Sequence, residues 1–240
     1  MKQYQKLQVD CTPSVPARKT RRMASILEPL VLILVPATLA VCAVWDYQQA
    51  AFAVFFLSFE RSKPALRQIM PTVVFAALAA AGRIIFAPIP DFKPVSATCI
   101  IAGATFGRQS GFMVGALAAL VSNFFFGQGA WTPWQMFAFG MIGFLAGILY
   151  QKGILKARKT ELCIYGFLSV FLIYGGIMNP ASALTWVGEL NEKVLLTYYI
   201  SGLPFDCIQA AATWLFLWFG AEPMLEKLDR IKVKYGMVEV

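Results

Sequence analysis

Apolar and polar positions along this chain fall into long blocks. Eight apolar runs are separated by short polar segments, at about residues 26–45, 48–59, 69–87, 95–107, 111–126, 135–150, 162–178 and 195–219. A helix rises 1.5 Å per residue, so about 20 apolar residues are needed to cross a hydrocarbon core of roughly 30 Å. Several runs are shorter than this, which predicts helices that end inside the protein or a locally thin bilayer. The run at 48–59 fits either a short span or a re-entrant hairpin.

The composition agrees with this pattern. Hydrophobic residues make up 58% of the 240 residues and charged residues only 14%, against about 25% charged residues in soluble domains. We therefore predict an all-α integral membrane protein, in contact with the lipid bilayer, whose length suits one compact bundle of six to eight spans.

Basic residues are distributed unevenly and predict the orientation of the spans. Of the 21 Lys and Arg residues, 18 fall on one side when the spans alternate: before residue 23, in segments 61–67 and 152–159, at Arg108, and after residue 220. Cytoplasmic loops carry the excess of positive charge. Both termini are therefore expected in the cytoplasm of a cell with a bacterial-type plasma membrane. The basic arm at 2–22 and the apolar run after it are interpreted as a retained anchor, since no clear cleavage site follows.

Several functional classes lack the residues that they need. The chain has no histidine, and its five cysteines form no CxxC pair, which leaves no support for a histidine metal site or for catalysis by a Ser-His or Cys-His pair. No GxxxxGK[ST] loop occurs, so ATP hydrolysis is not expected in this chain. We identify no catalytic residue, no metal ligand and no cofactor, and we expect no nucleic-acid partner.

The segment FAALAAAGR places small residues at helical spacing. Alanines four positions apart form a flat stripe, and close approach of helix backbones is a main source of attraction between helices in lipid. The stripe fits packing inside the bundle or docking of a separate subunit. The candidate docking residues are Ala76, Ala77, Ala80 and Ala81. Glycines that step by four, from Gly103 to Gly115 and again at Gly143 and Gly147, are assigned to internal packing.

The segment FFFGQGAWTPWQMF, residues 124–137, is expected to be an outward loop with binding chemistry. Gly127 and Gly129 let the backbone approach a partner closely, while amides and aromatic rings suit a flat, conjugated ligand that forms hydrogen bonds. An aromatic belt at the membrane surface is the alternative. The candidate binding residues here are Asn123, Gln128, Trp131, Trp134 and Gln135.

Two further outward loops and three polar residues inside spans complete the candidates. The loop at 179–193 could complete the mouth of a pocket with Asn179 and Trp186. The loop PIPDFKP, residues 88–94, carries Asp91 and Lys93 and could act as a gate or as a plain rigid turn. Charged residues inside membranes usually mark sites or structural pairs. These are Arg83 and Asp206, which could pair with each other, and the last span also carries Gln209.

Taken together, four motifs resemble the substrate-binding S components of energy-coupling factor (ECF) vitamin transporters. They are FAALAAAGRIIF, the proline-rich loop after it, GATFGRQSGFMVGALAALVSN and, most specifically, GQGAWTPWQM. The resemblance covers roughly residues 65–220 and implies a six-helix bundle. We expect a membrane core at 61–220, an added N-terminal helix or helical hairpin with a basic arm at 1–60, and a cytoplasmic tail at 221–240.

The resemblance also implies a mechanism. An S component captures a vitamin from outside and docks through its alanine face on a transmembrane coupling protein. Two ATPase subunits then drive a rearrangement in which the S component topples and releases the vitamin inward. Among vitamins we favour cobalamin or a related corrinoid, then riboflavin. The alternatives are a standalone secondary transporter, although no inverted repeat is evident, and a membrane enzyme acting on a lipid or isoprenoid through Asp206.

Overall fold

The computed structural model describes residues 66–156, 158–188 and 190–234, so the predictions for residues 1–60 lie outside the described residues. Its elements in chain order are α4 (Leu66–Ile85), α5 (Val95–Phe106), α6 (Arg108–Phe126), α7 (Thr132–Gln151), α8 (Lys159–Ser169), the π-helical η1 (Val170–Gly175), α9 (Gly176–Trp186) and α10 (Glu192–Lys234). Because α8, η1 and α9 follow one another without a break, the described residues form six helical segments.

The lengths and compositions of these segments suit membrane spans. Four are long and apolar enough to cross a membrane: Arg108–Phe126, Thr132–Gln151, Lys159–Trp186 and Glu192–Ile231. Two shorter apolar helices, Ile69–Ile85 and Val95–Phe106, complete the set. The prediction of an all-α, multi-pass membrane bundle is confirmed.

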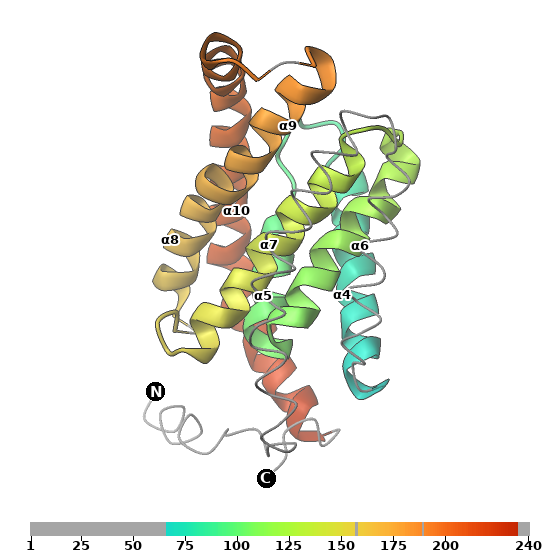
Figure 1. The fold of residues 1–240 in the computed structure, drawn as a ribbon. Coiled ribbons are helices and arrows are strands. Elements are labelled where there is room, and N and C mark those ends of the chain that lie inside the picture. Colours follow the sequence, from blue (N-terminus) through green and yellow to red (C-terminus); the bar gives the residue numbers. More distant parts are fainter. Residues whose placement is uncertain (1–65, 157, 189, 235–240) are drawn as a thin grey trace, which may run out of the picture.

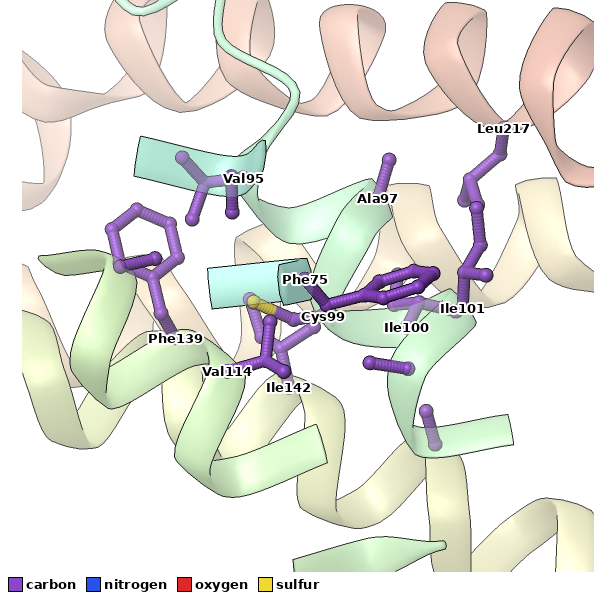
Figure 2. Packing of buried hydrophobic residues seen from close by; sticks show 14 of the residues in the cluster. Phe75, Val95, Ala97, Cys99, Ile100, Ile101, Val114, Phe139, Ile142 and Leu217 are labelled. Carbon is purple, nitrogen blue, oxygen red and sulfur yellow. The ribbon is translucent and has the colours of Figure 1, made fainter. Parts of the chain in front are cut away.

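Helix α5 lies at the centre of the bundle, while α4 and α8 lie at opposite sides of it (Figure 1). Residues 95–105 of α5 are all buried, which fits a helix that is apolar all round. Figure 2 shows how Phe75 of α4, Ile100 of α5 and Leu217 of α10 meet in the core. This short, enclosed helix explains why one of the apolar runs is too short to span the bilayer by itself.

Glycines allow α5, α6 and α7 to approach closely. A Cβ atom added to Gly111 would lie 2.6 Å from the Cα of Gly103 and 2.5 Å from the carbonyl oxygen of Gly143. Backbone therefore packs on backbone at this crossing, as small residues permit in membrane helices. The assignment of these glycines to internal packing is confirmed.

Two loops are shorter in the structure than the sequence analysis expected. The loop predicted at 124–137 shrinks to 127–131, because the three phenylalanines continue α6 and Thr132–Pro133 begin α7. Proline is well tolerated in the first turn of a helix, where its missing N–H is not needed. Most of the loop predicted at 179–193 is helical, since α9 continues to Trp186. Helix α9 contains Pro180, and a proline inside a membrane helix is tolerated when neighbouring helices stabilise it.

The last helix runs past the boundary predicted at residue 220. Helix α10 has 43 residues and continues through Pro204 and Pro223. Leu225 and Leu228 belong to the buried core cluster. The segment after residue 220 therefore begins as a packed part of α10 and not as a separate tail.

Candidate functional site

Arg83 lies in the last turn of α4 and is buried inside the bundle. Its Nη1 donates hydrogen bonds to Ser122 Oγ at 2.7 Å and to Asn123 Oδ1 at 2.9 Å, and its Nη2 donates to Gln135 Oε1 at 3.3 Å. All three acceptors are neutral. The positive charge is thus held by dipoles, and no carboxylate within ion-pair distance neutralises it in the described part of the chain.

Asn123 ties this network to the 127–131 loop. Its amide nitrogen donates to Thr132 Oγ1 at 3.2 Å and to Gln135 Oε1 at 3.0 Å. The N–H of Gly129 donates to the same Thr132 oxygen at 3.2 Å. Since a buried polar network is stabilising when its members are satisfied, these bonds fix the positions of Asn123 and Gln135 relative to Arg83.

Two basic residues, Arg83 and Lys93, lie over the ring of Phe126. The guanidinium carbon of Arg83 lies 5.1 Å from the Phe126 ring centroid, and Lys93 Nζ lies 5.3 Å from it. Both distances suit cation–π attraction. Lys93 is half-buried in the loop after α4, and this burial lowers the pKa of its ammonium group.

A small cavity opens beside this network. It has a volume of about 20 Å³ and is lined by Arg83, Asp91, Lys93, Val95, Gln135, Phe139, Tyr174 and Gln209. On the same measure one water molecule needs about 10–15 Å³. The cavity therefore holds about one water as it stands, and a vitamin requires side chains or a loop to move. The buried Nε of Arg83 has no hydrogen-bond partner among the described residues.

The connection between α4 and α5 supplies two of the lining residues of the cavity, Asp91 and Lys93. Two of its rings contact α10: the centroids of Phe86 and Phe92 lie 5.2 Å and 5.4 Å from that of Phe216. Asp91 adopts a φ of 52°, a conformation that is uncommon for a residue other than glycine. The connection is thus held in a defined shape over the cavity.

Asp206 and Arg83 do not pair, contrary to one option left open by the sequence. Asp206 instead accepts a hydrogen bond from the amide nitrogen of Asn179 at 3.1 Å. Gly175 and Gly202 give these side chains room, because a Cβ at either position would overlap one of them. Asp206 and Asn179 therefore form a structural pair between α9 and α10, and neither lines the cavity.

The candidate binding residues from the sequence separate into three groups. Gln135 lines the cavity, and Asn123 lies in the network behind it. Trp134 is buried in a second core cluster with Phe137 and Ala181, between α7 and α9, and lies outside the lining of the cavity.

The remaining candidates lie at the surface. Gln128 is exposed and donates to the carbonyl oxygen of Leu120 at 3.1 Å. Trp131 stacks on Trp186, with ring centroids 6.2 Å apart and an interplanar angle of 14°. These three residues lie outside the lining of the cavity.

The alanine stripe of α4 divides between two faces. Ala76 and Ala80 are buried in the bundle, whereas Ala77 and Ala81 are exposed. Successive residues of a helix are rotated by about 100°, and only Ala77 and Ala81 are accessible to a partner in this structure. The docking surface stays a prediction.

Sequence reasoning did not single out Phe139, Tyr174 and Val95 as cavity residues. Phe139 and Val95 lie within long apolar stretches and carry no distinguishing signal. Tyr174 is a polar residue in the π-helical η1, and π-helical turns are frequent at functional sites. Two glycines directly after this tyrosine are the signal that could have drawn attention to it.

Comparison with known proteins agrees with this architecture. The family model described as the S component of ECF-type riboflavin transporters matches residues 64–216, which include α4 to α9 and the first part of α10. No solved structure matches the chain. Because the matched region covers more than half of the chain and contains the cavity, the chain belongs to the family of S components of ECF-type riboflavin transporters.

Proposed function

We propose that this chain captures riboflavin from outside the cell and is the substrate-specific subunit of an ATP-driven uptake system. The observation that carries the proposal is the cavity beside the α4–α5 connection, whose lining combines the buried Arg83 with amides and aromatic rings. The family match favours riboflavin over cobalamin, the vitamin that the sequence analysis placed first.

The lining suits the chemistry of a flavin. One edge of the flavin ring system carries two carbonyl groups and an N–H. The amides of Gln135 and Gln209 can accept from this N–H, and they and Arg83 can donate to the carbonyls. Phe139 and Tyr174 offer rings against which a flat conjugated system can pack.

Binding needs the cavity to enlarge. Sites for ligands of this size occupy about 300–1,000 Å³, far more than the present cavity of about 20 Å³. The α4–α5 connection carries Asp91 and Lys93 and is the covering element that can move without breaking a helix. We therefore assign the gating role to this connection, with Asp91 and Lys93 at its inner surface.

The exposed face of α4 suits docking on a transmembrane coupling protein that acts with two ATPase subunits. Ala77 and Ala81 lie there among the larger exposed side chains of Val73, Val74 and Leu78. Small residues on such a face let a partner helix approach closely. In this proposal both termini are cytoplasmic and the α4–α5 connection faces outward.

Riboflavin binding is tested by titrating the purified chain in detergent and following the quenching of flavin fluorescence. Gln135→Ala is expected to weaken binding at least tenfold, because a hydrogen-bonding group that lines the cavity is removed from the site. The matched control is Gln128→Ala, which changes an exposed glutamine outside the cavity. Absence of saturable binding to the unaltered chain would refute the proposal for riboflavin, and equal affinity in both variants would refute the site.

Docking is tested by uptake into cells. Ala77→Trp combined with Ala81→Trp is expected to abolish uptake while riboflavin binding by the purified chain is retained. The control pair is Ile164→Trp with Leu168→Trp, which places the same bulk at exposed positions one turn apart on α8. Equal uptake by the two double variants would rule out the α4 face.

A further inference from the structure

Trp131 and Trp186 form a flat aromatic surface at the end of the bundle that carries the α4–α5 connection. Their rings are nearly parallel, at 14°, with centroids 6.2 Å apart. Trp186 is 71% exposed although one side of its ring faces Trp131. The other side of the Trp186 ring is therefore uncovered and available to a stacking partner.

The local backbone holds Trp131 in place. A Cβ atom on Gly129 would overlap the Trp131 ring, so the ring lies directly on the backbone of the 127–131 loop. The same loop is fixed by the hydrogen bond from the Gly129 N–H to Thr132. Trp186 therefore stacks on a ring that the loop already holds in place.

The aromatic pair lies close to a residue of the cavity. Trp131 directly precedes α7, and the N–H of Gln135, four residues later, donates a hydrogen bond to the Trp131 carbonyl oxygen at 2.9 Å. Phe139 follows four residues after Gln135, and Gln135 and Phe139 both line the cavity. Four residues correspond to about 6 Å along the helix axis. Trp131, on which Trp186 stacks, is thus about one helical turn from the first amide of the site.

We propose that Trp131 and Trp186 form a capture site, outside the cavity, on which the flat ring system of a flavin stacks before it moves inward to Gln135. The inference rests on the proposed function, because it assigns a first step to the same uptake. The capture site recognises a conjugated ring and ignores the substituent chain, which the cavity then selects. It explains why two tryptophans from distant segments are paired beside a cavity that neither of them lines.

The first test is the rate of association, measured by rapid mixing of riboflavin with the purified full chain. Trp186→Ala is expected to slow association about two- to tenfold, the range given by one aromatic contact, with an unchanged rate of dissociation. Trp186→Phe is expected to keep most of the association rate because it keeps a ring. The matched control is Trp214→Ala, since Trp214 is also partly exposed and stacked, on Trp218 at 5.1 Å.

Two results would overturn the capture site. If riboflavin associates equally fast with Trp186→Ala and with Trp214→Ala, Trp186 belongs to a general aromatic belt at the membrane surface. If only dissociation is accelerated, Trp186 holds the bound vitamin in the cavity and does not capture it.

A second test does not depend on tight binding in the cavity. Flavin mononucleotide, which is soluble at millimolar concentration and carries the same rings, is titrated against Gln135→Ala and against the double variant with Trp186→Ala. The single variant is expected to show additional saturable quenching of tryptophan fluorescence, and equal quenching in both would overturn the capture site. Failure of the proposed function would give a different result. The unaltered chain would not bind riboflavin, but Gln135→Ala would still show more quenching by flavin mononucleotide than the double variant.

Discussion

Replacing Arg83 with methionine tests the central feature of the site. Methionine fills a similar length of the interior without charge or donors. The change removes the hydrogen bonds to Ser122, Asn123 and Gln135 and a cationic group from the lining of the cavity.

The consequences for binding and for stability have different sizes. A hydrogen bond from a charged group contributes about 1.5–3 kcal/mol, so losing one such bond to the ligand raises Kd about 10- to 150-fold. In the network, Gln135 Oε1 keeps its bond from Asn123, and Ser122 still donates to the Ala119 carbonyl oxygen. Asn123 Oδ1 loses its donor, which costs about 1–3 kcal/mol. Removing a buried charge offsets part of this cost.

The assay is a riboflavin titration of each variant together with its thermal unfolding in detergent. Arg83→Met is expected to bind at least tenfold more weakly while its Tm falls only modestly. Arg158→Met is the control, because Arg158 is an exposed cation in the connection between α7 and α8. Unchanged affinity in Arg83→Met, with the protein folded, would show that Arg83 is a structural residue and would refute the reasoning.

Two further predictions concern the α4–α5 connection and the packing of the core. Phe92→Ala removes one of the two rings through which the α4–α5 connection contacts Phe216, so dissociation of bound riboflavin is expected to accelerate about two- to tenfold; an unchanged rate in a stopped-flow chase would mean that the connection does not gate the cavity. Gly111→Ala places a Cβ 2.5 Å from the Gly143 carbonyl oxygen and should cost about 1–3 kcal/mol, seen as a lower Tm. Gly176→Ala, with no atom within 4 Å of its Cβ, should leave Tm nearly unchanged, and equal Tm values for the two glycine variants would contradict the packing argument.

The loops show where local sequence signals give a wrong answer. Glycine and proline in GQGAWTPW suggest a long loop, yet only residues 127–131 leave the helices. Proline at the start of a helix and proline in a turn look alike in a sequence. Packing of the neighbouring helices decides between them, which is why Thr132–Pro133 begin α7.

The alanine stripe shows a second limit. The spacing of four positions correctly predicts small residues on helix faces, but it applies equally to Ala76 with Ala80 and to Ala77 with Ala81. These pairs differ by about 100° of rotation on the helix. Only contacts with the neighbouring helices determine that the first pair is buried and the second exposed.

The sequence by itself determined the helical membrane fold, the apolar helical segments of the described core and the family, because apolar block length and local motifs depend on residues close together in the chain. The tertiary structure alone decided the site. Arg83 and Gln209 are brought to one cavity with residues from three other helical elements and the α4–α5 connection. The choice of acceptors that hold the Arg83 charge, and the pairing of Trp131 with Trp186, depend on distances between segments far apart in the chain. Those distances are set by how the helices pack.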